Sequence, residues 1–137
     1  MSLDITVSFR PWKDGNQMAK LGLDGTLDTA TAPQLERQLA SVFEGPTQIL
    51  VFDLGKLSFL SSGGVRVLLA ARKRVIERNG SCMMLKLQPR IEKTFEIIKA
   101  LDGLMLFKDD EALDAFLATL QKPAAAQEPV ATGREGR

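Results

Sequence analysis

Two serines and two glycines, Ser61-Ser62-Gly63-Gly64, stand between an apolar run and an amphipathic segment of this 137-residue sequence. Small polar residues at a strand-to-helix junction can cap the helix, cradle a phosphate, hold a nucleophile or accept a phosphoryl group. Each of these roles needs different neighbours, so the rest of the sequence can separate them.

The sequence contains no histidine and a single cysteine, Cys82. The lack of histidine excludes every Ser-His-Asp and Cys-His arrangement for nucleophilic catalysis and removes the commonest zinc ligand. A lone cysteine cannot form an intramolecular disulfide, and the apolar run around Cys82 predicts a buried core residue rather than a reactive thiol. We therefore expect no catalytic residue, no metal and no cofactor in this chain.

Two other kinds of site that handle phosphate, a P-loop and a receiver-type phosphoaspartate, have less support in the sequence. A P-loop needs Gly-x-x-x-x-Gly-Lys-Ser/Thr before a helix, and Leu50 stands where the first glycine before Gly55-Lys56 would be. Asp53 could instead be the phosphoacceptor of a receiver domain, but that chemistry needs an acidic pair after the first strand to hold Mg²⁺. The first strand runs into a hairpin turn, so we expect Asp53 to be structural and to accept backbone N–H bonds.

Composition limits the remaining classes of partner. The net charge of +1 gives no electrostatic attraction to nucleic acid. No apolar run approaches the ~18 residues of a membrane span, and no secretory signal is recognisable. We expect one cytoplasmic domain over residues 1–121, no nucleic-acid partner and no membrane insertion. Residues 122–137 lack apolar periodicity, which predicts a disordered tail.

The domain divides into alternating strands and helices. A hairpin is predicted from residues 3–9 and 18–23 around the turn dipeptide Asp14-Gly15. The further predicted elements are a helix that opens at Thr31 and ends before Gly45, a strand over 48–54, a helix over 64–78, a strand over 82–87, a helix over 90–101, a strand over 104–107 and a helix over 109–120. This order predicts an α/β fold: a mostly parallel five-stranded sheet with an antiparallel first strand and with helices packed on the sheet.

Capping and apolar patterns give more detail on three helices. Thr31 with Gln34 fits a capping box at the start of the first helix. Apolar residues at helical spacing predict the buried stripes, which are Leu35, Leu39, Val42 and Phe43 in the first helix, Ile91, Phe95 and Ile98 in the third, and Leu113, Phe116, Leu117 and Leu120 in the last.

Two polar, glycine-bearing loops are expected at one edge of the sheet, because functional loops follow the carboxyl ends of parallel strands. They are residues 24–31 and residues 55–64, and they would bring Asp24, Asp28 and Ser61-Ser62 into one surface patch. A serine at a helix N-terminus can carry a phosphate at little structural cost, so Ser61 or Ser62 could be a regulatory phosphoacceptor. The alternative is that these serines only cap the helix.

The sequence resembles the STAS domains, the sulphate transporter and anti-sigma factor antagonist family, and especially the free-standing bacterial antagonists. The resemblance covers about residues 3–121 and lies in "GLDGTLDTATAPQLERQL" and "VFDLGKLSFLSSGGVRVLLAARK". It implies that Ser62 takes the position of the family's acceptor serine and Gly64 that of the family's following glycine. We therefore expect Ser62 to be both helix cap and phosphorylation switch. Ser61 stands where many members have aspartate, and Gly63 where they have serine or alanine.

The resemblance also implies a function and a set of partner-binding residues. The unphosphorylated form would bind an anti-sigma factor serine kinase, a GHKL-type ATPase, and so free a sigma factor. Phosphorylation of the serine would end the interaction, and a phosphatase would restore it. The implied partner-binding residues are Asp24, Leu27, Asp28, Ser61, Ser62, Gly63, Gly64 and Arg66. The alternative within the family is a STAS module of another assembly, such as a stressosome-like complex or a lipid-transport system.

Overall fold

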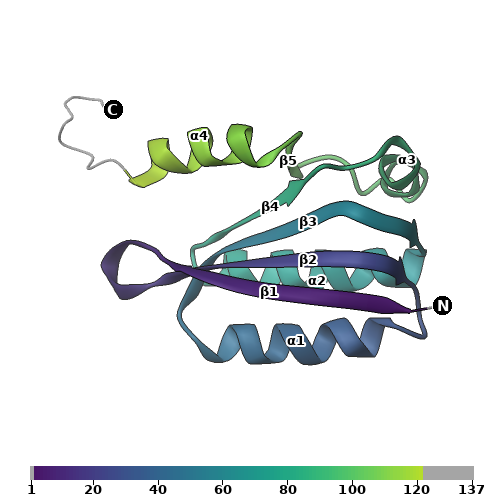
Figure 1. The fold of residues 1–137 in the computed structure, drawn as a ribbon, viewed down its shortest axis with the longest axis horizontal. Coiled ribbons are helices and arrows are strands. Elements are labelled where there is room, and N and C mark those ends of the chain that lie inside the picture. Colours follow the sequence, from purple (N-terminus) through teal and green to yellow (C-terminus); the bar gives the residue numbers. More distant parts are fainter. Residues whose placement is uncertain (1, 122–137) are drawn as a thin grey trace.

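The computed structural model describes residues 2–121 as a five-stranded sheet with helices on both of its faces (Figure 1). In chain order the elements are β1 (Leu3–Pro11), a 3-10 turn η1 (Lys13–Gly15), β2 (Gln17–Leu27), α1 (Ala32–Glu44), β3 (Thr47–Leu60), α2 (Ser62–Glu77), β4 (Ser81–Leu85), α3 (Pro89–Ile97), β5 (Met105–Phe107) and α4 (Asp110–Gln121). The proposed tail, residues 122–137, lies outside the described residues. Among the helices that the structure describes, none is both long and apolar enough to cross a membrane.

The sheet has the strand order β1-β2-β3-β4-β5. β1 pairs with β2 in antiparallel orientation, and the pairs β2–β3, β3–β4 and β4–β5 are all parallel. The predicted fold class is therefore confirmed. The same order contradicts the receiver alternative, because receiver domains have the doubly wound order 2-1-3-4-5.

The two faces of the sheet bury separate apolar clusters, and successive side chains of β2 point alternately into one cluster and toward the other face. Ala19, Leu21 and Leu23 face the larger cluster, to which α1, α2 and α3 contribute, whereas Met18 faces a smaller cluster covered by α4. Figure 1 shows α1 and α2 running along the sheet and α4 lying beyond β4. Uniformly buried β3 residues such as Val51 and Phe52 are explained by this two-sided cover.

The buried stripes are largely as predicted. Every stripe residue of α1 is buried, and in α4 Leu113 and Leu117 are buried while Phe116 and Leu120 pack at the margin. The prediction that Ile98 belongs to the buried stripe of α3 is wrong, because α3 ends at Ile97 and the Ile98 side chain is 38% exposed.

The predicted capping box at the start of α1 is also wrong. The Thr31 side chain makes no cap bond; its hydroxyl donates to the Thr26 carbonyl at 2.8 Å. The turn before α1 is held by a carboxylate, because Asp28 Oδ1 accepts from the backbone N–H groups of Ala30 at 2.9 Å and Thr31 at 3.0 Å. Gln34 reaches across to the Leu3 carbonyl of β1 rather than back to Thr31.

β2 and β3 are both longer than predicted. β2 runs to Leu27 and β3 to Leu60, so residues 24–27 and 55–60 are paired strand and not loop. The register shifts between Gly22 and Asp24 and between Gly25 and Thr26, which breaks the simple alternation that marks a strand in sequence. Gly25 has a φ of 116°, and a side chain there would collide with the backbone of Ser2.

Cys82 is buried in β4, as expected for a core residue. Burial raises the pKa of its thiol to about 12, although the positive charge of Arg72 acts in the opposite direction. The thiol is therefore protonated at neutral pH and is a poor nucleophile.

Ion pairs join α4 to the sheet. Lys20 of β2 donates to Asp110 at the start of α4, and the Lys86 ammonium lies 3.2 Å from Asp110 and 3.6 Å from Asp53. The hydrogen bond from Lys20 lowers the pKa of Asp110, with a further contribution from Lys86, while partial burial opposes this shift. Asp53 also accepts from the backbone N–H of Gly55 at 3.0 Å, so the expected bond to a backbone N–H is present.

Asp110→Asn is predicted to destabilise the protein at neutral pH and to lose this effect in acid. A carboxylate whose pKa is lowered by folding stabilises the native state fully above its unfolded pKa of about 4, and the contribution disappears as pH falls through the lower folded value. The loss at pH 7 should stay below about 1 kcal/mol, since the pair is solvent-exposed. Urea unfolding of both proteins from pH 7 downward measures it. Glu111→Gln, in the same turn and without an ion pair in residues 2–121, is the control; a pH-independent difference would contradict the prediction.

Candidate functional site

The two serines at the junction between β3 and α2 have different structural roles. Ser61 is the N-cap: its backbone is extended, with φ −90° and ψ 168°, and its Oγ accepts from the Gly64 N–H at 3.1 Å. Ser62 is the first residue of α2 and its side chain is exposed. The expectation that Ser62 caps the helix is therefore wrong, because the capping serine is Ser61.

The start of α2 is held against the end of β2. The Ser61 backbone N–H donates to the Leu27 carbonyl at 3.0 Å. Gly64 is buried directly over the same residue, and a Cβ on Gly64 would lie 2.7 Å from the Leu27 carbonyl oxygen. Glycine is required here because the helix backbone approaches β2 too closely for any side chain.

A second contact joins the turn after β2 to α2. A Cβ on Gly63 would lie 2.7 Å from Cγ2 of Thr29, so the threonine methyl fills the space that a side chain at position 63 would occupy. The sequence reasoning did not select Thr29, which is exposed. The signal in the sequence that could have indicated this contact is Gly63 itself. A helical backbone does not require glycine in its first turn, so a glycine there indicates that another part of the chain lies close by.

Most of the predicted site residues do come together. β2 and β3 end side by side at the pair Leu27–Leu60, so Asp28 and Ser62 follow at the same end of the sheet, on the right in Figure 1. Asp28 is half-buried and bonds to the turn before α1, and Arg66 is exposed one turn after Ser62. Leu27 is 0% exposed, so it supports this surface from the core and cannot contact a partner in the folded protein.

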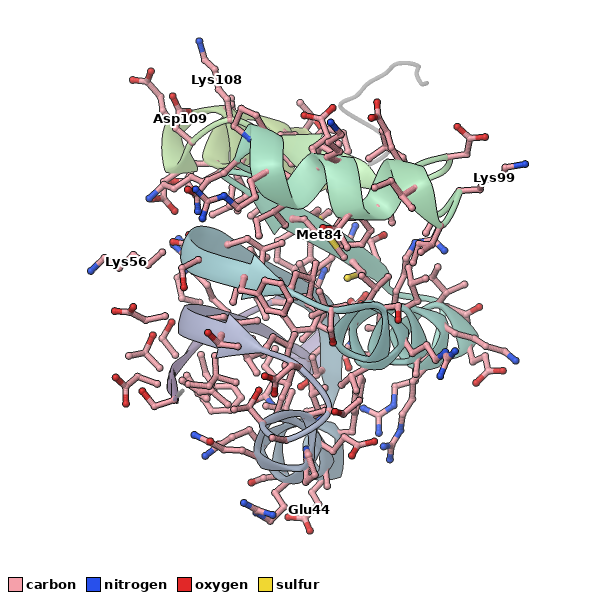
Figure 2. The ribbon with its side chains drawn as sticks, turned by 90° about the vertical axis from the view of Figure 1, so that its right-hand side faces the viewer. Glu44, Lys56, Met84, Lys99, Lys108 and Asp109 are labelled. Carbon is pink, nitrogen blue, oxygen red and sulfur yellow. The ribbon has the colours of Figure 1, made fainter. Side chains whose placement is uncertain are left out.

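Asp24 does not join this surface. Gly25, Thr26 and Leu27 continue β2 beyond it, and the Asp24 side chain points into a cavity of about 370 Å³ on the face of the sheet that α1 and α2 do not cover. That cavity is lined by Asp4, Thr6, Gly22, Leu23, Asp24, Asp53, Gly55, Lys56 and Lys86. Figure 2 shows Lys56, the register partner of Asp24, projecting away from α2. Sequence reasoning placed Asp24 with Ser62 because it took residues 24–27 for loop.

Within residues 2–121, no three histidine, cysteine, aspartate or glutamate side chains are arranged to hold a metal ion. What the junction offers is an exposed hydroxyl at a helix N-terminus. The backbone N–H groups of Ser62 and Gly63 have no hydrogen-bond partner within the described chain.

Comparisons with known proteins agree on one family. The family model described as the STAS domain matches residues 14–112. A putative anti-sigma factor antagonist of Bordetella bronchiseptica, BtrV, is 33% identical over 97 residues, which cover 71% of this chain and 84% of that protein.

Solved structures resemble the fold closely. An anti-sigma factor antagonist from Mycobacterium paratuberculosis matches with a TM-score of 0.70 and 25% identity, covering 83% of this chain and 93% of that one. The anti-sigma factor antagonist SpoIIAA in its unphosphorylated form matches with a TM-score of 0.68 and 20% identity, covering 84% of this chain and 97% of that one.

Substituting each serine by alanine should separate the cap from the exposed hydroxyl. Ser61→Ala removes the acceptor for Gly64 and is predicted to lower the free energy of unfolding by about 0.5–2 kcal/mol. Ser62→Ala removes no contact and should change it by less than about 0.5 kcal/mol. Urea unfolding at neutral pH measures both. An equal loss for Ser62→Ala would contradict the assignment of the cap to Ser61.

The contact between Thr29 and Gly63 can be tested by a double-mutant cycle. Gly63→Ala gains helix propensity, about 0.8–1.0 kcal/mol, but its methyl collides with the Thr29 methyl. Thr29→Ser removes that methyl and keeps the hydroxyl. We predict that Gly63→Ala is more favourable in the Thr29→Ser background, with a coupling of about 0.5 kcal/mol or more. Additive effects would show that the two residues do not restrain each other.

Proposed function

The chain belongs to the STAS domain family, and we propose that it is a non-catalytic anti-sigma factor antagonist of the cytoplasm. In its unphosphorylated form it binds an anti-sigma factor serine kinase, a GHKL-type ATPase, and so frees a sigma factor. Phosphorylation of Ser62 ends that complex, and a phosphatase restores the binding form. ATP belongs to the kinase, and the chain itself uses no cofactor.

The observation that carries the proposal is the division of roles between Ser61 and Ser62. The Ser61 hydroxyl is engaged as the helix cap, whereas the Ser62 hydroxyl is exposed and makes no bond within the described chain. A kinase can therefore modify Ser62 without breaking the cap. The unpartnered N–H groups of Ser62 and Gly63 and the helix dipole stabilise a phosphate at this place.

Local charge explains how phosphorylation would end binding. A phosphoserine carries about −1.5 to −2 charges at pH 7. Asp28 follows the neighbouring strand at the same end of the sheet, and Arg66 is the cation one turn into α2. A phosphate on Ser62 makes this nearly neutral surface strongly negative, so a partner that fits the unmodified surface meets a charge that it does not compensate.

The docking surface under this proposal is the exposed turn around Thr29 together with the first turn of α2. Thr29, Ala30, Ser62 and Arg66 are exposed there. Ser61, Gly63 and Gly64 shape the helix start, and Leu27 supports it from beneath. Asp24 lies in the separate cavity and is not part of the surface as we propose it.

Affinity capture with matched baits tests the function. The wild-type chain and Ser62→Ala should retain a GHKL-type ATPase from a lysate of the native cell, because the docking surface stays uncharged. Ser62→Asp should weaken that complex tenfold or more, about 1.4 kcal/mol, although the carboxylate suits the helix dipole and leaves stability unchanged or higher. Ala70→Asp, which adds the same charge to an exposed position farther along α2, is the control.

Phosphate mapping completes the test. After incubation of the captured complex with ATP, mass spectrometry should find phosphate on Ser62 of the wild-type chain and none on Ser62→Ala. Equal binding by Ser62→Asp, or phosphate on another residue, would contradict the switch. Capture of lipid-transport or stressosome components in place of a kinase would assign the chain to the alternative assemblies.

A further inference from the structure

The outer strand β1 has one paired side and one free side. Its nine residues, Leu3–Pro11, pair with β2 alone. In every pair the residue number in β1 and the residue number in β2 add to 28, as in Leu3 with Gly25. The bonds from Thr26 N–H to the Ser2 carbonyl and from Trp12 N–H to the Asn16 carbonyl belong to the same register. Because such bonds alternate along an antiparallel pair, even-numbered residues of β1 bond to β2 and odd-numbered residues direct their N–H and C=O groups outward.

The free edge has little of the protection that edge strands usually carry. Proteins blunt such edges with charges, prolines, bulges or a covering element. Residues 5–9 are uncharged and contain no proline, and Pro11 comes only at the end of the strand. In residues 2–121 the outward backbone groups of Ile5, Val7 and Phe9 have no partner, whereas the Leu3 carbonyl accepts from Gln34. The Phe9 side chain is 51% exposed.

We propose that β1 pairs with β1 of a second copy of this chain, antiparallel and with the two-fold axis at Val7. In this register the numbers of opposite residues add to 14, so outward-facing odd residues meet each other as hydrogen-bonded pairs. Val7 lies opposite Val7 of the second copy, and Ile5 lies opposite Phe9. Every outward N–H and C=O group of these residues then gains a partner.

The side chains are self-complementary in the same register. Asp4 of one copy lies opposite Arg10 of the other, and Thr6 lies opposite Ser8, all on the sheet face away from α1 and α2. Opposite charges and hydroxyl pairs across strands stabilise a sheet. On the other face Ile5, Val7 and Phe9 of both copies form one apolar strip, in which Ile5 and Val7 already pack against the core. A shift by two residues would place Asp4 opposite Ser8 or Trp12 and lose the charge pairing.

Pairing at β1 leaves the proposed kinase site open. β1 begins beside the end of β2, where Ser61 and Ser62 follow, and ends beside the hairpin turn. The two-fold axis therefore sends the Ser62 regions of the two copies to opposite ends of the joined sheet. The dimer is independent of the proposed function, and either can fail without the other.

Charge reversal tests the partner and the register together. Assembly depends on concentration, so sedimentation velocity from about 5 to about 500 µM should show the purified chain passing from monomer to dimer. Asp4→Arg and Arg10→Asp each place like charges opposite each other and should weaken the dimer tenfold or more. The double variant restores opposite charges and should recover the wild-type dissociation constant.

Two further variants keep the test independent of folding defects. Val7→Pro removes an outward N–H at the centre of the pair without removing a bond to β2, and it should give a folded monomer by circular dichroism. Asp114→Asn removes the intramolecular partner of Arg10, 3.4 Å away, and should leave the dimer intact. A monomer at all concentrations, a dimer that survives Val7→Pro, or a double variant that fails to recover would each overturn the proposal.

Discussion

The end of the molecule that carries the proposed docking surface depends on the pairing of the last residues of β2 with those of β3. At the last pair, Leu27–Leu60, the Leu27 carbonyl accepts from the Ser61 N–H, and Gly64 brings α2 down onto the same carbonyl. This close contact fixes where α2 begins. It also fixes how the turn after β2 meets the first turn of α2, so two loops that follow different strands form one surface.

The close contact explains why adjacent serines differ in role. Ser61 lies between the strand and the helix in an extended conformation, and its hydroxyl oxygen accepts a hydrogen bond from the Gly64 N–H in the first turn of the helix. Ser62, one residue later, has helical geometry and projects outward. A capping hydroxyl and an exposed hydroxyl can therefore be neighbours in sequence, because the cap is the residue before the helix and the exposed serine is the first residue within it.

The mixed sheet gives the molecule three distinct surfaces. The carboxyl ends of β2 and β3 carry the proposed docking site, the face away from α1 and α2 carries the cavity with Asp24, and β1 presents a free edge. The antiparallel hairpin causes this separation. It puts β1 at the outside of the sheet, where the free backbone groups of its uncharged centre, residues 5–9, lie away from Ser62.

The sequence by itself determined the order of elements, the parallel sheet with its antiparallel first strand and most of the apolar core, because burial periodicity and turn dipeptides are local signals. Through the resemblance to the family motif it also singled out Ser62 as the acceptor that we propose. Only the tertiary structure decided that Asp28 holds the turn before α1, that Ser61 caps α2 and that Asp24 belongs to another surface. The physical reason differs between the two kinds of residue. Which residue caps a helix depends on where the helix starts to within one residue, which sequence patterns do not resolve. The pairing of residues 24–27 with 56–60 contains register shifts, so these residues lack the simple alternation by which a strand is recognised in sequence.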